Sequence, residues 1–233
     1  GAAPIQRFQV LTKVTRSAYH AAFRSISPDH MVQFADEFGK HMADIICSKD
    51  LVLSDLLGLM RHDYYTYTHS VNVSACSVAL ANRLRATDRR DLEAIAAGAL
   101  MHDIGKRHIP PYLLNKRGPL TDQDREQLQG HVRMGFEELC MRDDVTWAQL
   151  MMVYQHHERL DGRGYPSRLT SEEIHDWARI CAVVDVFDAM RSARPYRQRI
   201  ALREVMDFLC RQSGVQLDQE MVRCWNTAIR CKS

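Results

Sequence analysis

The sequence predicts an all-α protein, and three observations support this fold class. Apolar residues recur at spacings of three and four along most of the chain, as they do on the buried face of a helix. Residues that typically begin helices precede several of these apolar stretches. No segment alternates convincingly between apolar and polar residues, and the chain contains neither repeats nor low-complexity tracts.

The first part of the chain is expected to hold an unassigned segment followed by helical stretches. Residues 1–27 show little periodicity and could be a linker or a docking segment. Ser27 and Pro28 are typical residues at a helix start. The apolar face that follows them consists of Met31, Phe34, Ala35, Phe38, Met42, Ile45 and Ile46. Further apolar stretches cover residues 51–60 and about 65–84, the second burying Val73, Cys76, Val78 and Leu80.

The second part of the chain is expected to contain six helices. Asp88 can cap a helix that runs to His102 and ends at Gly105, and the proline-rich and glycine-rich residues 105–120 are expected to form a loop. Thr121 and Thr170 begin sequences of the capping-box type. The remaining helices are expected at residues 121–139, 147–157, 180–190, 202–209 and 221–229, with a turn at residues 162–166.

Composition indicates one large domain, or one domain with a small extension. The 233 residues are 45% hydrophobic, and their formal net charge of +2 argues against general binding to nucleic-acid polymers or membranes. No apolar run approaches the roughly 20 residues of a membrane span, and no segment resembles a signal peptide. The seven cysteines contain no Cys-x-x-Cys pair and are expected to be reduced thiols in a cytoplasmic protein. Because the chain begins with Gly1 rather than methionine, it is expected to be part of a longer protein.

Five histidines stand beside carboxylates or near the ends of predicted helices. They are His69, His102, His131, His156 and His157, with Asp103, Asp185 and Asp188 as the accompanying carboxylates. A lone core histidine is usually a hydrogen-bonded structural residue, but five in one core would each need a polar partner. Metal coordination satisfies all of them together. Adjacent His102 and Asp103 point about 100° apart on a helix, so both can reach one centre only near a helix end.

These residues belong to stretches that resemble the HD-GYP subfamily of the HD phosphohydrolase superfamily. Characterised members of that subfamily hydrolyse the bacterial second messenger cyclic diguanylate. The matching stretches are residues 67–73, 102–106, 109–110, 130–131, 156–166 and 185–197, including the intact Gly164-Tyr165-Pro166 sequence. The resemblance implies a single bundle of about seven core helices, here with an extra N-terminal helix, around a binuclear metal centre.

The resemblance also implies a role for each site residue. His69, His102, Asp103 and Asp185 would surround one metal, and His131, His156 and His157 the second, with Asp103 bridging both. A hydroxide between the metals would be the nucleophile, and Lys106 would hold a phosphate oxygen as a catalytic and substrate-binding residue. Tyr165, Asp188, Arg194 and Arg197 match positions that contact substrate in the subfamily. Tyr165 could equally pack within its turn, and Glu158 and Asp161 are expected to orient neighbouring histidines and arginines.

Two divalent ions are expected, and both are expected to be iron or manganese. Nickel, cobalt and zinc are alternatives, because imidazole and carboxylate ligands suit all of these metals. Some subfamily members carry a glutamate four residues before the first ligand histidine, where it supports a third metal. Tyr65 occupies that position here, which favours two metals over three, although Asp63 lies nearby. Metal number bears on whether the product is the linear dinucleotide or GMP, which the sequence leaves open.

Two other functions remain open from the sequence. The first is an HD phosphohydrolase that acts on another cyclic dinucleotide or phosphoester, and the second is a catalytically silent binding module. Residues 61–233 are expected to form the catalytic domain. Residues 1–60 are expected to form an N-terminal segment with a helix that is either a connector or a scaffold. The apolar face of residues 31–46 could form a homodimer interface, and a regulatory domain could precede the chain.

Overall fold

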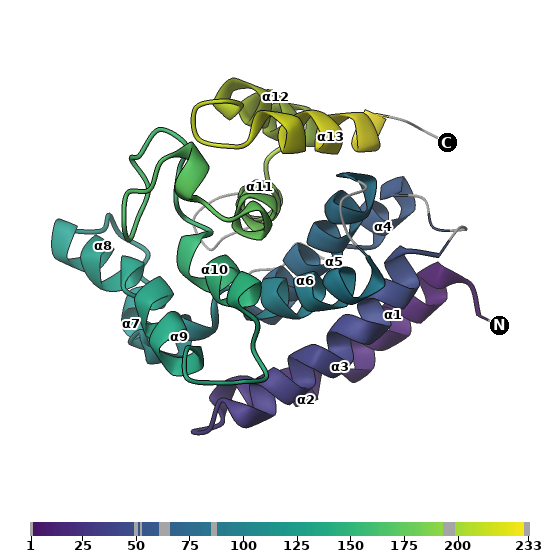
Figure 1. Ribbon diagram of the computed structural model, residues 1–233, viewed down its shortest axis with the longest axis horizontal. Coiled ribbons are helices and arrows are strands. Elements are labelled where there is room, and N and C mark those ends of the chain that lie inside the picture. The colour runs from purple at the N-terminus through teal and green to yellow at the C-terminus, as the bar shows by residue number, and fades with distance from the viewer. Residues whose placement is uncertain are drawn as a thin grey trace.

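The computed structural model describes residues 2–48, 51, 53–60, 66–84, 88–192 and 199–230, and these residues contain no β-strand. The fold is all-α, as the sequence predicts (Figure 1). The α-helices are α1 (Pro4–Val14), α2 (Arg16–Arg24), α3 (Asp29–Ile46), α4 (Leu53–Leu59), α5 (Thr66–Leu84), α6 (Arg89–Met101), α7 (Pro111–Leu114), α8 (Asp122–Gln129), α9 (His131–Leu139), α10 (Trp147–Gln155), α11 (Asp176–Arg191), α12 (Leu202–Gln212) and α13 (Gln219–Arg230). Two 3₁₀ turns, η1 (Ile104–His108) and η2 (Ser171–Glu173), lie between them.

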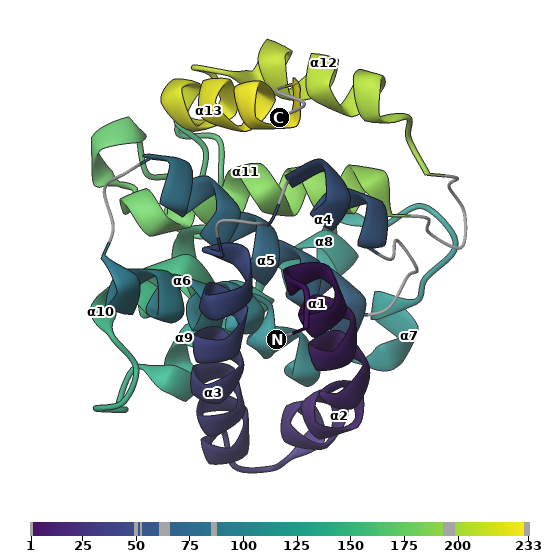
Figure 2. The ribbon, with the colours of Figure 1, turned by 90° about the vertical axis from the view of Figure 1, so that its right-hand side faces the viewer.

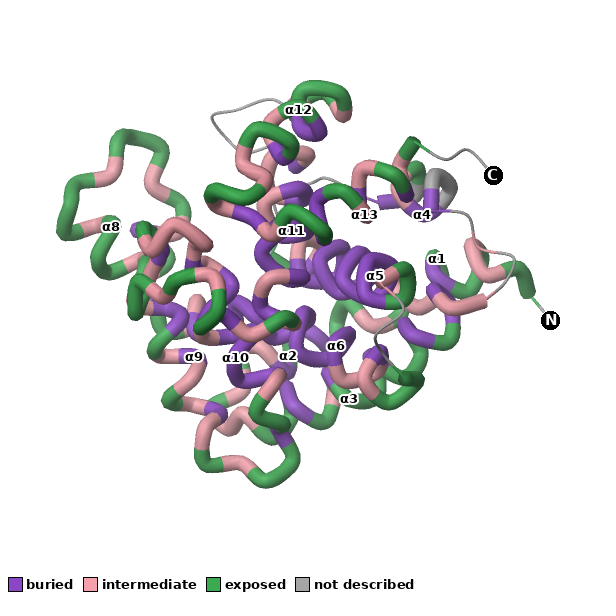
Figure 3. Tube along the Cα trace, turned by 45° about the horizontal axis from the view of Figure 1, so that its top comes forward, coloured by how far each residue is buried: buried purple, intermediate pink, exposed green. Residues whose placement is uncertain are grey.

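Helix α5 is the centre of the bundle and is buried along most of its length (Figure 3). It packs against α3, α6 and α11, which cover it on several sides. Val73, Cys76, Val78 and Leu80 are completely buried on it, as the sequence predicts. Helix α5 is buried on almost all sides, and its buried residues include the polar Ser70, Asn72, Ser74 and Ser77, whereas the outer helices expose a polar face.

Residues 4–24, which are expected to be a linker or a docking segment, form α1 and α2, and both helices lie beside α3 (Figure 2). Phe8 and Tyr19 bury their rings against the core. The hydroxyl groups of Tyr19 and Ser70 are hydrogen-bonded at 3.1 Å, and Tyr67 Oη donates to the carbonyl of Thr12 at 2.5 Å. Both helices therefore contact the start of α5.

Local signals predicted several helix starts correctly. The side chain of Asp88 accepts the N–H of Asp91 at the start of α6, and Thr121 caps α8 within a capping box. Thr170 is the N-cap residue of the short turn η2, and α11 begins six residues after it. Helix α3 begins at Asp29, one or two residues later than predicted, with Ser27 Oγ accepting the N–H of Asp29.

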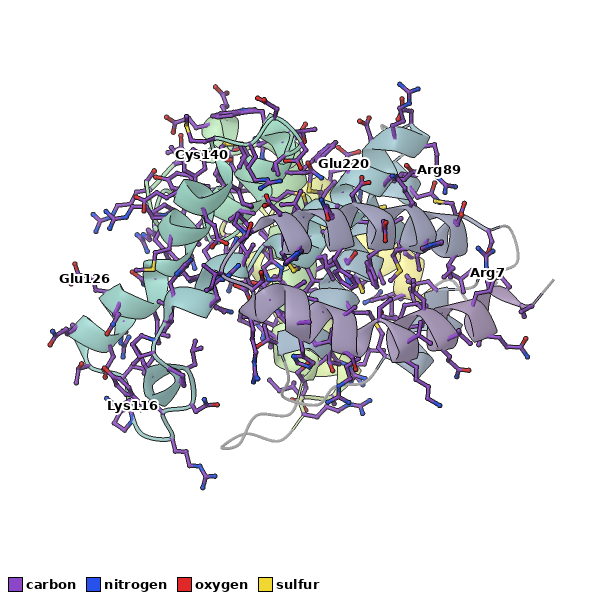
Figure 4. All side chains as sticks on the ribbon, turned by 90° about the horizontal axis from the view of Figure 1, so that it is seen from below. Arg7, Arg89, Lys116, Glu126, Cys140 and Glu220 are labelled. Carbon is purple, nitrogen blue, oxygen red and sulfur yellow. The ribbon has the colours of Figure 1, made fainter. Side chains whose placement is uncertain are left out.

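The loop expected at residues 105–120 contains most of η1 and the whole of α7. Helix α8 follows it and packs against α7 and α9. In Figure 4, the part of the chain that carries Lys116 and Glu126 projects from the side of the bundle. Among the described residues, no helix has both the length and the apolar character that a bilayer span requires.

Helices α12 and α13 close the bundle beside α11 (Figure 1). Trp225 on α13 is completely buried, and its ring meets that of Phe187 edge to face at a centroid distance of 5.3 Å. Since Phe187 lies between Asp185 and Asp188 in the sequence, this contact fixes the rotation of the part of α11 that carries both carboxylates.

Candidate metal centre

The structure brings the seven predicted metal ligands into one cluster, although six different elements carry them. Most of these residues lie at or just beyond a helix end, and the other two project from the middle of α11 and the first turn of α5. The ligands form two groups in which the potential donor atoms lie within 4.8 Å of one another. The groups are Asp103, His131, His156 and His157, and His69, His102 and Asp185.

Asp103 lies between the two groups and is 2% exposed. Its Oδ1 is 3.2 Å from Nε2 of His131 and 3.7 Å from Nε2 of His156. Its Oδ2 is 3.3 Å from Nε2 of His102 and 3.8 Å from Nε2 of His69. Each carboxylate oxygen therefore faces a different group of histidines, which is the arrangement a bridging ligand requires.

Backbone carbonyls fix the tautomers of three of these histidines. Nδ1 of His102 and Nδ1 of His131 each lie 2.7 Å from the carbonyl oxygen three residues earlier. Nδ1 of His156 lies 3.0 and 3.1 Å from the carbonyl oxygens four and three residues earlier. A carbonyl oxygen only accepts, so Nδ1 carries the proton in each ring. In the neutral imidazole, Nε2 then presents a lone pair toward Asp103.

The centre of the cluster consists of acceptors that face other acceptors. Nε2 of His102, His131 and His156 and Oδ1 of Asp103 are all buried without a hydrogen-bond partner among the described residues. Four unpaired buried acceptors would cost several kcal/mol, at about 1–3 kcal/mol each. A divalent cation would satisfy them all, so the residues present fit a metal centre.

His69 is held by a side chain rather than by the backbone. Its Nδ1 lies 2.7 Å from Oδ2 of Asp188, whose Oδ1 accepts a 2.7 Å hydrogen bond from the amide of Asn72. The other ring nitrogen of His69, Nε2, lies 3.1 Å from Oδ1 of Asp185. Asp188 has no exposed surface, and the hydroxyl of Ser192 also contacts Oδ2. The carboxylate of Asp188 therefore lies behind the ring of His69 and orients it, and the expected contact of Asp188 with substrate stays a prediction.

Sequence reasoning missed Asn72, although a signal was available. It lies three residues after His69, so both side chains lie on one face of α5.

A family model described as HD domain matches residues 40–221, most of the chain. The chain belongs to the HD domain family. The family resemblance recognised from the motifs is thereby confirmed.

Curated relatives of this HD domain are named as cyclic-dinucleotide phosphodiesterases. A cyclic di-GMP phosphodiesterase of Pseudomonas aeruginosa is 36% identical over 206 residues, which are 88% of this chain and 48% of that protein. A 3'3'-cGAMP-specific phosphodiesterase of Vibrio cholerae is 36% identical over 152 residues, 62% of this chain and 33% of that protein. The chain thus spans half or less of the length of these relatives.

A solved structure supports the fold of the HD domain. The HDG"Y"P protein from Bdellovibrio bacteriovorus aligns with a TM-score of 0.82, over 99% of this chain and 74% of that chain. The two sequences are 19% identical, so the likeness concerns the arrangement of the helices.

Burial and carboxylates shift the pKa values of the histidines in opposite directions. Burial lowers the pKa of His156 to about 4, and burial together with the charge of His156 holds the pKa of His157 well below its ordinary value. Burial would also lower the pKa of His69, but hydrogen bonds to Asp185 and Asp188 outweigh it and raise that pKa to about 10. Because metals bind neutral imidazole, His156 and His157 can coordinate near pH 7 without first losing a proton.

Lys106 and Tyr165 lie at the edge of the cluster. Lys106 Nζ donates to Oδ2 of Asp103 at 2.5 Å and is partly exposed, and its charge helps to hold the pKa of Asp103 well below the usual range despite burial. The ring of Tyr165 lies 4.8 Å from that of His157, and burial raises its pKa, which keeps the hydroxyl protonated. The predicted substrate residues Arg194 and Arg197, and the position of Tyr65, lie outside the described residues.

A loop from Glu158 to Leu169 covers one side of the cluster. Glu158 is buried and accepts the N–H groups of Ser167 at 2.6 Å and Leu169 at 3.1 Å, so it anchors the loop rather than a histidine. A cavity of about 300 Å³ adjoins this loop and reaches two of the predicted ligands, His156 and His157. Its lining includes His156, His157, Arg163, Tyr165 and Gln216.

Proposed function

We propose that this HD domain is a metal-dependent phosphodiesterase that hydrolyses cyclic diguanylate to the linear dinucleotide or further to GMP. The observation that carries the proposal is the position of Asp103 between two groups of histidines, three of which present a buried and unpaired Nε2. The curated relative from Pseudomonas aeruginosa supports the substrate, since its name states the same activity and it aligns with 88% of the chain. The cavity beside the cluster supplies a place for a nucleotide next to the reacting phosphate.

We propose two divalent ions, with Asp103 shared between them. The first would be held by His69, His102 and Asp185, and the second by His131, His156 and His157. Two bound cations would supply a nucleophilic oxygen near neutral pH and neutralise charge on the phosphate. Iron or manganese suits the nitrogen and oxygen donors, and the described part of the cluster offers no thiolate.

The protein's own groups bind and orient the phosphate. The ammonium group of Lys106, beside Asp103, is placed to stabilise negative charge on a non-bridging oxygen. Tyr165 offers a protonated hydroxyl and a ring face at the wall of the cavity. Asp188 keeps the ring of His69 in place. We further propose that Arg194 and Arg197 contact the substrate, as the motif match suggests.

The mixed guanine–adenine dinucleotide is the second candidate substrate. The relative from Vibrio cholerae that carries this specificity in its name matches the chain as closely in percentage identity as the first relative does, although over fewer residues. Both substrates present the same phosphodiester groups to the metal centre. The choice between them therefore rests on the base contacts, and a side-by-side comparison of the two substrates decides it.

Hydrolysis of cyclic diguanylate by protein prepared without oxygen and supplied with Fe(II) or Mn(II) tests the proposal, with products resolved by chromatography. The double variant His102→Ala, Asp103→Ala should lose activity and bound metal. The control is His41→Ala, because His41 is an exposed histidine of α3. Cleavage with two metals per chain, abolished only in the double variant, is expected. Two bound metals without cleavage of either cyclic dinucleotide would refute the proposed substrate class, and absence of both metal and cleavage would favour a binding module.

A further inference from the structure

A second cavity, of about 610 Å³, lies against the same loop and is lined by residues of α8, α9 and the loop. Arg163 and Tyr165 line both this outer cavity and the inner cavity that reaches His156 and His157. The inner and outer cavities therefore adjoin at Arg163 and Tyr165.

The outer cavity is basic. Arg133, Arg163 and Arg168 line it from separate positions, and Glu126 is the carboxylate that opposes them. Arg133 is paired with Glu137 of its own helix at 3.5 Å, whereas the guanidinium groups of Arg163 and Arg168 form no ion pair with any described residue. Two exposed cations that face one cavity without a carboxylate partner favour an anionic ligand.

Arg168 occupies a backbone conformation that is unfavourable for an arginine. Its φ is 57°, in the left-handed region, where glycine is free of the steric cost that any Cβ imposes. An arginine held at such a position is more informative than an arginine on a helix surface. Arg168 lines the outer cavity, so the residue with the unfavourable backbone conformation is also one of the two that carry an unpaired charge there.

The loop is built to hold Arg163 in place. Asp161 accepts the N–H of Arg163 at 3.1 Å and is itself clamped by two hydrogen bonds from Arg159, at 2.9 and 2.8 Å. The Arg159 pair and the N–H of Arg163 lower the pKa of Asp161 to about 2. Gly164 packs so closely that a Cβ there would lie 2.5 Å from the backbone of Glu158 and Arg159. The backbone that presents Arg163 is thus preorganised for binding.

We propose that Arg163 and Arg168 bind the phosphate of a cyclic dinucleotide that is not being cleaved. This inference rests on the proposed function, which places the reacting phosphate at the metal centre. A cyclic dinucleotide carries two phosphates, and Arg163 lines both the cavity beside the cluster and the outer cavity. The pair of arginines would then distinguish substrates with two phosphates from simple phosphodiesters.

Three variants test the proposal. Arg163→Gln removes the charge at the shared wall of the two cavities, and Arg168→Gly removes the second charge while relieving the backbone. The matched control is Arg125→Gln, which removes the same charge from α8 at a residue that lines neither cavity. Two quantities are measured for each protein. The first is the ratio of kcat/KM for cyclic diguanylate to that for bis(p-nitrophenyl) phosphate, and the second is the affinity of EDTA-treated protein for cyclic diguanylate.

We expect Arg163→Gln and Arg168→Gly each to raise the KM for cyclic diguanylate roughly five- to twentyfold, as the loss of a charge-assisted contact with phosphate predicts. The kcat/KM ratio and the affinity should fall by a similar factor, and Arg125→Gln should change both less than twofold. Arg168→Gly should keep or raise the midpoint of thermal unfolding, since glycine adopts the left-handed conformation without strain.

Changes below twofold in both arginine variants would refute the proposal, and so would equal losses on the two substrates, which would indicate general damage to the loop. A lower unfolding midpoint for Arg168→Gly would assign that residue a structural role instead. If the wild-type protein cleaves bis(p-nitrophenyl) phosphate but not cyclic diguanylate, the proposed function fails. The affinity measurement then decides the binding role of the two arginines by itself.

Discussion

Replacing Gly105 by alanine should displace the backbone of His131, a predicted metal ligand, and so disturb the metal centre. Gly105 lies two residues after Asp103, where η1 packs against the start of α9. A Cβ at this position would lie 1.9 Å from the carbonyl oxygen of His131 and 2.6 Å from the backbone nitrogen of Gly135. Both contacts are with backbone, so no side-chain rotation relieves them. The first separation must open by about 1 Å to reach the shortest distance that real Cβ atoms tolerate.

Overpacking of this kind costs about 1–3 kcal/mol. In a domain of this size each kcal/mol lowers the midpoint of thermal unfolding by about 2–4 °C, so Gly105→Ala should lower it by about 2–12 °C. Because the displaced group is the backbone of His131, bound metal should fall from the proposed two ions toward one per chain. Calorimetry and elemental analysis measure the two effects.

The control is Gly118→Ala, because no atom lies within 4 Å of a Cβ built at Gly118. This variant should keep both its unfolding midpoint and its metal content. If Gly105→Ala unfolds within 1 °C of the wild-type protein and retains all of its metal, then the contact between η1 and α9 does not set the position of His131, and the reasoning is refuted.

Three further predictions follow from single contacts. Asp188→Asn should weaken metal binding about 10- to 100-fold, because His69 loses the carboxylate that orients its ring. Competition with a chelating dye measures the metal affinity, and an unaltered affinity would contradict this prediction. Tyr19→Phe should lower the free energy of unfolding by about 0.5–1.5 kcal/mol in urea, because Ser70 loses a buried partner; an unchanged value would show that this hydrogen bond contributes nothing. Asp161→Asn should destabilise the protein above pH about 5 and have little effect near pH 2. The folded pKa of this carboxyl, about 2, lies below its unfolded value of about 3.9, so its contribution is lost as pH falls through that interval. A destabilisation independent of pH would contradict this assignment.

The sequence allowed the fold class and the residues of the histidine and aspartate cluster to be predicted because both depend on local patterns. Helical spacing and caps such as Asp88 and Thr121 act within a few residues. The histidines could be recognised because each lies in an apolar stretch beside a helix end or a carboxylate. The resemblance to known motifs then grouped them, which spacing alone could not do across 117 positions, from His69 to Asp185.

Features that depend on tertiary contact could not be predicted in the same way. Helices α1 and α2 bury few large side chains, chiefly Phe8 and Tyr19, so their periodicity is weak and packing against the core stabilises them. Asp185 and Asp188 lie three residues apart on one face of α11, and only the position of His69 shows which carboxylate points into the cluster and which lies behind the ring.

The same hydrogen bond, from Nδ1 of a histidine to a backbone carbonyl at a helix end, recurs at three histidines of the cluster and fixes the position of their rings. His102 and His156 directly follow the last residues of α6 and α10, and His131 follows the C-cap of α8. Each donates from Nδ1 to a carbonyl in the preceding turn, where helices leave carbonyl oxygens unsatisfied. One hydrogen bond thus completes the helix end and fixes the tautomer. It also brings the negative ends of three helix dipoles toward the cation site.

His69 lacks this hydrogen bond to a backbone carbonyl because it lies in the first turn of α5, where backbone N–H groups rather than carbonyls are free. A side chain must therefore accept from its Nδ1, and Asp188 fills that role from α11. No substitution can remove a backbone carbonyl, whereas a single substitution removes the carboxylate of Asp188. The ion that we propose to be held by His69, His102 and Asp185 should consequently be the more easily lost when residues around the cluster, rather than the ligands themselves, are changed.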